Sequence, residues 1–324
     1  MALNPIPINQ CIWKDYLAAQ GAKLPHLKDV EDVTDRVIRI MGGNPGEMQL
    51  QGTNTYLVGT GKSRILIDTG QVRIYQQVRC PYMSLTSSQG MPIWAENIIK
   101  VLESRGLEIS HVLLTHWHGD HTGGVPDLIR YDPRIADRVW KNRPDKGQHA
   151  INDGDVFRCE GATVRALFTP GHAEDHMCFI LEEENAMFTG DNVLGHGYSV
   201  AEDLGAYMNS LSYMEAQLCS VGYPAHGVKI ENLPRTIKQY IRHKQTRERQ
   251  IYLALVRRRA ESPERSGYGM TTRELVEAVH GQVPDRLFEL ALEPFTTEVL
   301  WKLAEDRKVG FQMDRGRRKW FLNE

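Results

Sequence analysis

The stretch THWHGDHTGG, Thr115 to Gly124, places three histidines and one aspartate within six residues. Imidazole nitrogens and carboxylate oxygens bind zinc and related divalent ions at about 2.0–2.2 Å. In an extended or tightly turning segment, residues two apart share a side, so His116 and His118 can bind one ion. Asp120 and His121 then point toward a second ion. The motif therefore predicts a metal site, which segments from elsewhere in the chain must complete.

The remaining ligands are expected at the ends of other strand-like runs. Each candidate follows an apolar run and is flanked by glycine, which lets the backbone approach a crowded centre. These candidates are His172 in TPGH, Asp191 in FTGD and His226 in YPAHG. A single histidine beside glycine is usually a polar loop residue, but this combination predicts a metal centre. His176 and His196 stay open as partners of ligands, substrate contacts or loop residues.

Strand-like and helix-like segments alternate around these motifs. RVIRIMG, TNTYLVGT and SRILIDTG are rich in β-branched residues and bounded by turn residues, which is typical of strands. ISHVLLTH is an apolar run that delivers His116 at its C-terminal end, where ligand sites of layered α/β folds lie. The pattern predicts an α/β fold with two packed sheets flanked by helices.

The sequence pattern changes along the chain and indicates three regions. Residues 1–33 are interpreted as an N-terminal extension, and residues 34–235 as the metal-binding domain. Residues 236–324 begin with one long helical stretch and end in the order helix, strand, glycine turn, strand. That order is typical of a small winged-helix-like module, a fold that does not by itself imply DNA binding.

Composition narrows the function class. The chain has 324 residues and a formal net charge of −2, so its overall charge does not point to nucleic acid or a membrane. From Ile241 onward, however, 17 Lys and Arg face 13 Asp and Glu, a net charge of +4 against −6 for the rest. This basic end either docks an acidic partner or is a solvated surface.

Cysteine usage and hydropathy bear on the compartment. The five cysteines form no CxxC pair, which favours free thiols in a reducing compartment, and we expect a cytoplasmic protein. The segment MALNPIPINQ lacks the features of a signal peptide, and no run approaches the roughly 18 apolar residues of a membrane span.

With these residues in view, the chain resembles the metallo-β-lactamase superfamily. THWHGDH, TPGH, TGD and PAHG match its motifs, and LIDTG, which contains Asp68, matches the first of them. The resemblance implies an αββα sandwich with a dinuclear site at one edge, holding two Zn²⁺ per chain. It assigns His116, His118 and His172 to one zinc, Asp120, His121 and His226 to the other, and Asp191 as the bridge. PAHG departs from the commoner PGHG but keeps the ligand.

Two zinc ions would lower the pKa of a shared water from about 15.7 toward about 7 and so supply hydroxide at neutral pH. This nucleophile attacks an electrophilic carbonyl or phosphorus. We expect Asp120 to be the catalytic residue that orients it and carries a proton toward the leaving group. A thiolate needs little protonation to leave, which makes a thioester a suitable substrate.

Two branches of the superfamily fit the sequence. The closer resemblance covers nearly the whole chain and is to fungal thioesterases that release polyketides from a carrier protein, of the atrochrysone carboxyl carrier-protein type. It rests on runs such as LLTHWHGDHTGGVPDL, ATVRALFTPGH, DHMCFILEEENAMFTGDNVLGHG and GYPAHGV. It implies hydrolysis of an aromatic polyketide thioester, with the acyl carrier domain of a non-reducing polyketide synthase as partner.

The alternative is an endoribonuclease branch that acts on single-stranded RNA and shares LQGTNTYLVGTG, LIDTG and THWH. Nucleic acid is the less favoured partner because the sequence shows no stripe of aromatic and basic residues that would stack bases. Trp94, Trp117 and Trp140 are scattered and are interpreted as packing residues.

One segment, residues 72–89, interrupts the resemblance. Removing VRIYQQVRCPYMSLTSSQ joins LIDTGQ to GMPIWAENI, as in the resembling families. We hypothesise a retained intron of 18 codons, with a genuine surface loop as the competing interpretation. Transcripts that mostly contain the segment would refute the intron hypothesis.

Overall fold

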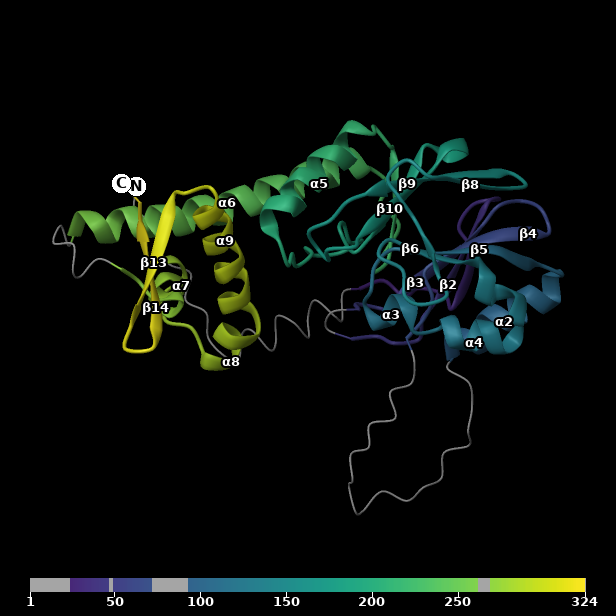
Figure 1. The fold of residues 1–324 in the computed structure, drawn as a ribbon, viewed down its shortest axis with the longest axis horizontal. Coiled ribbons are helices and arrows are strands. Elements are labelled where there is room, and N and C mark those ends of the chain that lie inside the picture. The colour runs from purple at the N-terminus through teal and green to yellow at the C-terminus, as the bar shows by residue number, and fades with distance from the viewer. Residues whose placement is uncertain (1–23, 47–48, 72–92, 262–268, 324) are drawn as a thin grey trace, which may run out of the picture.

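Figure 1 shows the computed structural model of the chain, which describes residues 24–46, 49–71, 93–261 and 269–323. Its main body contains two mixed sheets. The first has seven strands in the order β1 (Val30–Asp32), β2 (Val37–Met41), β3 (Asn54–Val58), β4 (Ser63–Ile67), β5 (Glu108–Leu114), β6 (Val139–Lys141) and β7 (His149–Ala150). The second has the order β12 (Val221–Pro224), β11 (Ala186–Gly190), β10 (Met177–Leu181), β9 (Ala162–Phe168) and β8 (Val156–Cys159).

The side-chain alternation of the strands explains why the sheets stack. In β10, Met177, Phe179 and Leu181 enter the core between the two sheets, whereas Cys178 and Ile180 belong to the core on the other face. Successive strand residues point to opposite faces, so a strand that is apolar throughout must be covered on both. All five residues of β10 are indeed buried.

Helices cover the outer face of each sheet. α2 (Ile93–Arg105) and α4 (Val125–Tyr131) pack on the first sheet, while α5 (Leu204–Ala216) and α6 (Leu233–Glu261) cover the second (Figure 1). Trp94 of α2 is fully buried, and its indole donates a hydrogen bond to Thr55 Oγ1 at 2.8 Å. The predicted α/β sandwich with helices outside is confirmed. Short helical turns are α3 (Gly119–Thr122), η1 (Pro133–Arg138) and η2 (Glu182–Glu184).

The C-terminal elements pack along the far part of α6 (Figure 1). They are α7 (Thr272–His280), α8 (Asp285–Leu287), η3 (Phe288–Leu292), α9 (Glu293–Glu305), β13 (Val309–Asp314) and β14 (Arg317–Leu322). The predicted long helix and the predicted order of helix and hairpin are both present. Thr271 caps α7 in a capping box with Glu274. The winged-helix assignment and the region boundaries stay predictions.

Two of the sequence predictions concern residues near or beyond the ends of the described segments. β1 lies within the expected N-terminal extension and pairs antiparallel with β2. The segment interpreted as a retained intron, residues 72–89, lies outside the described residues. Within the part of the chain that is described, no helix is long and apolar enough to cross a bilayer.

A buried ion pair joins α6 to α9. Lys244 Nζ lies 3.0 Å from Glu298 Oε1, and the two side chains are only 2% and 5% exposed. Burial lowers the pKa of Lys244 and raises that of Glu298, so each charge depends on the other. Lys244 Nζ also lies 5.2 Å from the ring centre of Tyr207 in α5.

Lys244→Met is expected to lower the free energy of unfolding by about 3–5 kcal/mol, because it removes the ammonium group that pairs with the buried Glu298 carboxylate. Urea unfolding followed by circular dichroism measures this change. The double variant Lys244→Met/Glu298→Leu should recover most of the loss, since it removes both charges. A single variant as stable as the native protein would contradict the coupling.

Candidate metal centre

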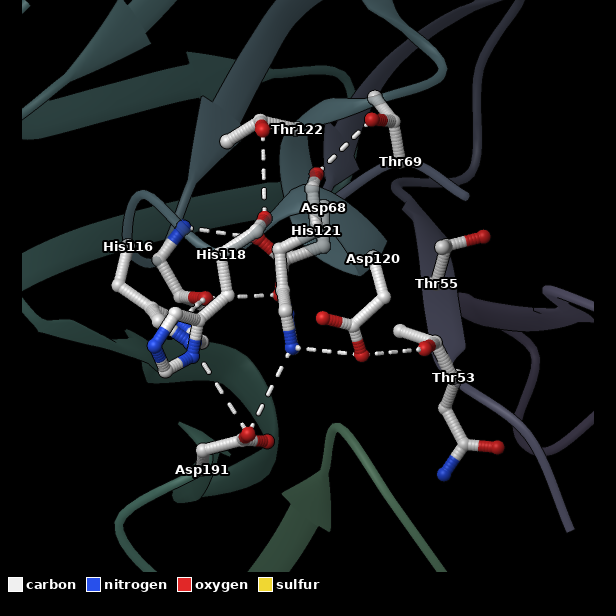
Figure 2. A network of polar contacts seen from close by, with 12 residues as sticks. Thr53, Thr55, Asp68, Thr69, His116, His118, Asp120, His121, Thr122 and Asp191 are labelled. Atoms are coloured by element: carbon white, nitrogen blue, oxygen red, sulfur yellow. Dashed lines mark hydrogen bonds and ion pairs between the residues drawn. The ribbon is translucent and has the colours of Figure 1, made fainter. Parts of the chain in front are cut away.

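Four separate segments bring the predicted ligands to one edge of the sandwich. The loop after β5 carries His116 and His118, and α3 carries Asp120 and His121. His172 follows β9, and Asp191 follows β11 directly. His226 follows β12. Figure 2 shows the predicted ligands of the THWHGDH motif and Asp191 pointing toward one another. Strand ends of both sheets therefore form the site, as expected for a layered α/β fold.

The first group consists of His116, His118, His172 and Asp191, whose ligand atoms all lie within 4.8 Å of one another. His118 Nδ1 lies 2.8 Å from His116 Nε2 and 3.3 Å from His172 Nε2. Asp191 Oδ2 lies 3.4 Å from His172 Nε2. Two ligands of a tetrahedral ion with bonds of about 2.0–2.1 Å lie about 3.3 Å apart, so this spacing suits one ion.

The second group consists of Asp120, His121 and His226. Asp120 Oδ2 lies 3.4 Å from both His121 Nε2 and His226 Nε2. The Thr53 hydroxyl donates a hydrogen bond of 3.0 Å to the same oxygen, which fixes the carboxylate. These separations again match those of ligands around a single ion.

Asp191 lies between the two groups. Its Oδ2 atom is 3.9 Å from His116 Nε2 and 3.6 Å from His121 Nε2, and its Oδ1 atom is 3.2 Å from His226 Nε2. One carboxylate thus faces ligands of both groups. The structure brings all seven predicted residues together, and their roles as ligands, with Asp191 as bridge, remain predictions.

Hydrogen bonds at the outer ring nitrogens set which nitrogen four of the five predicted histidine ligands offer. His121 Nδ1 donates to Asp68 at 2.9 Å, His172 Nδ1 to the Val200 carbonyl at 2.8 Å, and His226 Nδ1 to the Gly52 carbonyl at 3.3 Å. His116 Nδ1 lies 2.9 Å from Thr115 Oγ1. With the proton held outside, the Nε2 lone pairs face the centre, which is the arrangement of metal-binding imidazoles.

Two buried polar atoms at the centre lack hydrogen bonds within the described part of the chain and would be satisfied by a bound cation. His121 Nε2 and Asp191 Oδ1 form no hydrogen bond with any described residue, although both are buried. Unpaired buried polar atoms are costly, and coordination of a metal satisfies them. Several lone pairs and two carboxylates converge here, so the residues fit a pair of divalent cations.

The pKa shifts of the predicted ligands also favour a positive charge at the centre. Although burial alone raises the pKa of Asp191, His226 and His121 hold it well below its usual range. Burial likewise raises the pKa of Asp120. His121 and His226 lower that pKa by more than burial raises it, so the carboxyl is ionised. Burial lowers the pKa of His121, yet the carboxylates of Asp191, Asp68 and Asp120 raise it well above normal. A divalent cation supplies the positive charge that these carboxylates favour.

Asp68 accepts hydrogen bonds that hold the metal-binding loop and one predicted ligand in place. It is 2% exposed and accepts hydrogen bonds of 2.8 Å from both the amide and the hydroxyl of Thr115. It also accepts the hydrogen bond from His121 Nδ1, and its φ of +58° places it in the left-handed region. One carboxylate thus orients both the start of the THWHGDH loop and a predicted ligand.

Asp68→Asn is expected to lower metal affinity or kcat/KM by about 10–100-fold, because the amide of the new side chain cannot accept every bond that Asp68 accepts. Asparagine tolerates the left-handed backbone, so the fold should persist. Metal content after dialysis and kcat/KM measure the effect. Asp132→Asn, at the N-cap of η1, is the matched control. Native metal binding in the Asp68 variant would contradict this role.

The two ambiguous histidines take different positions. His176 is fully buried, and its Nε2 accepts a hydrogen bond of 3.1 Å from the amide of Asp191. A Cβ on Gly190 would lie 2.5 Å from that ring, which explains the glycine before Asp191. His176 therefore positions a predicted ligand. His196 is exposed and lines a cavity beside the site.

Sequence reasoning misjudged or missed several residues. Trp94 is buried as predicted, but Trp117 is 51% exposed beside His118, so its interpretation as a packing residue is wrong. The buried ion pair of Lys141 and Asp175, at 2.6 Å, was not predicted. The amide of Trp117 donates to Asp175 at 3.3 Å, which ties this pair to the metal-binding loop. No local pattern marks such a pair, because its partners lie 34 residues apart.

Comparisons with known proteins agree with this geometry. Residues 49–226 match the family model of the metallo-beta-lactamase superfamily. The chain is 59% identical to the lactamase-like protein adaB of Aspergillus niger, over 98% of this chain and 95% of that one. It is 56% identical to the lactamase-like protein nscB of Aspergillus fumigatus, over 99% of this chain and 94% of that one.

Among solved structures, a beta-lactamase domain protein from Burkholderia ambifaria superposes with a TM-score of 0.71 at 17% identity, covering 93% of this chain and 95% of that one. This likeness shows a common fold. The family match, the two fungal relatives and the buried His/Asp groups agree with one another. The chain therefore belongs to the metallo-beta-lactamase superfamily and is a metal-dependent hydrolase.

Proposed function

We propose that the protein is a zinc-dependent thioesterase of fungal secondary metabolism. Its substrate is an aromatic polyketide acyl group on the carrier domain of a non-reducing polyketide synthase, and its product is a carboxylic acid of the atrochrysone type. The fungal relatives support the branch of the superfamily. The observation that carries the choice of partner is a row of cations on α6 beside the metal centre.

Hydrolysis of a thioester adds the oxygen of water to the acyl carbon and breaks the C–S bond, which yields a carboxylic acid and a thiol. When bound, two zinc ions supply a lowered water pKa and polarisation of the carbonyl. Asp120, held by Thr53 and placed between His121 and His226, is positioned to orient the attacking water and to take its proton. The thiolate departs with little protonation.

The side chains of α6 carry a large excess of positive charge. The helix contains nine Lys or Arg and only two Glu. Arg235, Lys238, Arg242 and Arg249 are exposed at spacings of three, four and seven residues, so they share one helix face. We call these four residues the α6 cation row. Arg242 and Arg249 form no ion pair with a described acidic side chain, which leaves their charge for a partner.

The α6 cation row begins at a cavity beside the metal centre. Arg235 lines the same cavity as Leu194 and Gly195, and the amide of Gly195 donates a hydrogen bond of 2.8 Å to the carbonyl of His226. An acidic carrier domain docked along α6 would therefore present its thioester next to the predicted ligands. Complementary charge accelerates such an encounter and fixes its orientation.

Reversing charge in the α6 cation row is expected to impair only the reaction that uses the carrier. For Arg242→Glu/Arg249→Glu, the ratio of kcat/KM on carrier-bound thioester to that on the N-acetylcysteamine thioester should fall about tenfold at low salt. Release of free thiol reports both reactions. Lys100→Glu/Arg158→Glu changes the same charge at exposed sites elsewhere and should leave the ratio intact. An unchanged ratio in the α6 variant would refute docking there.

An endoribonuclease acting on single-stranded RNA is the second candidate, since the α6 cation row also suits a phosphate backbone. RNA cleavage that weakens in the α6 variant, in a protein that cleaves no thioester, would favour this alternative. Thioester cleavage that a chelator abolishes would favour the thioesterase.

A further inference from the structure

A cavity of 470 Å³ lies beside the metal centre, between the loop that follows Asp191 and the start of α6. Its lining includes Tyr198 and Tyr240 together with the polar side chains of Lys229, Glu231, Arg235 and Gln239. Small-molecule sites have volumes of about 300–1,000 Å³ and combine apolar surface with a few polar groups. The cavity has the size and the composition of a binding site.

The cavity shares a wall with the metal centre. Its loop carries Gly195, bonded to the His226 carbonyl, and reaches Ser199 and Val200. The Val200 carbonyl accepts the bond from His172 Nδ1, and Ser199 Oγ lies 3.2 Å from the same nitrogen. Both ends of the loop thus contact predicted ligands, so a molecule in the cavity lies one loop away from the reacting atoms.

Tyr198 gives the cavity a flat aromatic surface. Its ring stacks on the His243 ring with centres 3.8 Å apart and an angle of 5° between the planes. The Tyr240 ring supports it at 4.9 Å, and the Tyr240 hydroxyl accepts a hydrogen bond from the amide of Leu194. Tyr198 is nevertheless 46% exposed, so a ring that is held rigidly still offers surface to a ligand.

His243 is uncharged at neutral pH. Burial, followed by the neighbouring Arg247 and Lys244, lowers its pKa to about 4. A neutral imidazole stacks on Tyr198 without a charge that would attract a counter-ion into the cavity. The stacked pair is therefore an apolar platform at neutral pH.

We propose that this cavity binds the planar, hydroxylated aromatic acyl group of the substrate, and that Tyr198 determines specificity by stacking on it. This inference rests on the proposed thioesterase function and names the part of the substrate that the chain recognises. Lys229, Arg235 and Gln239 offer donors to carbonyl and phenolate oxygens, and Glu231 accepts from phenolic hydroxyls. A nucleobase would stack equally well, and Lys229 and Arg235 could accept its phosphate, so AMP is the competing ligand in the test.

Direct binding tests the cavity without requiring turnover. The probe is 6-hydroxy-2-naphthamide, which is planar and hydroxylated and whose hydroxyl and amide groups lie too far apart to chelate a metal. Calorimetry on the metal-loaded protein should show that Tyr198→Ala raises its Kd about tenfold, whereas Tyr198→Phe keeps it within about twofold. Tyr213→Ala, which removes an exposed tyrosine of α5 outside the lining, is the control and should leave Kd unchanged.

A second variant fills the cavity instead of emptying it. Gln239→Trp replaces an exposed lining residue on α6 and should weaken the probe about as much as Tyr198→Ala does. In turnover, both variants should lower the ratio of kcat/KM for the 6-hydroxy-2-naphthoyl thioester to that for the acetyl thioester. That ratio is a specificity measure, which general damage to the metal centre would not change.

The outcomes separate the cavity from the proposed function. Unchanged probe affinity in both variants would overturn the inference, as would tighter binding of AMP than of the naphthamide. Binding that depends on Tyr198 in a protein that hydrolyses no thioester would uphold the aromatic site and refute the thioesterase. Thioester hydrolysis with an unaltered ratio in both variants would uphold the thioesterase and refute the specificity role of Tyr198.

Discussion

Asp120→Asn is expected to lower kcat/KM by about 10²–10⁴-fold while leaving the fold intact. Asp120 Oδ2 lies 3.4 Å from two predicted ligands, and asparagine offers only a neutral amide there. The variant therefore loses both the charge that attracts a cation and the base that takes a proton. The measurement is steady-state turnover, together with metal content and the circular dichroism spectrum.

Asp127→Asn is the matched control for this substitution. It changes the same chemical group seven residues later on α4, where Asp127 pairs with the exposed Arg130. Its rate should be close to that of the native protein. If Asp120→Asn also retains a near-native rate, Asp120 is neither a ligand nor a proton carrier, and the assignment fails.

Gly171→Ala is expected to lower the free energy of unfolding by about 2–4 kcal/mol and to reduce bound metal. A Cβ at this position would lie 2.3 Å from the backbone nitrogen of Tyr207, and the φ of +130° already disfavours any residue but glycine. Relief of the clash moves α5 away or displaces His172, the next residue. Thermal unfolding and metal analysis report the two effects separately.

Gly154→Ala separates backbone strain from the clash. Gly154 also has a positive φ, of +84°, but no described heavy atom lies within 4 Å of its added Cβ. Its substitution should cost only about 1 kcal/mol. Equal losses in the two variants would show that close contact with Tyr207 is not what requires glycine before His172.

The convergence of the seven candidate residues was predictable because the chemistry is local at each position. Metal ligands on a tight turn leave a dense motif, and His172, Asp191 and His226 each follow an apolar run beside glycine. Gly171 and Gly190 show why: in each case a Cβ would clash with the wall of the site. The two-sheet fold was predictable for the same reason, since strand patterns are local.

Other features depend on tertiary contacts and left no pattern. His176 lies four residues after His172 but acts through its contact with the amide of Asp191. The packing interpretation failed for Trp117 because neighbouring residues of an irregular loop point in unrelated directions. The pairing of Tyr198 with His243 joins residues 45 positions apart, on a loop and a helix. Such contacts require the folded chain.

The measurement that tests the central claim most directly is turnover of the zinc-loaded protein on two substrates in parallel. One substrate is an aromatic polyketide-type acyl thioester on a carrier domain, and the other is single-stranded RNA. We predict release of the carboxylic acid from the carrier, abolished both by a chelator and by Asp120→Asn. Cleavage of RNA with no cleavage of the thioester would contradict the account and assign the protein to the nuclease branch.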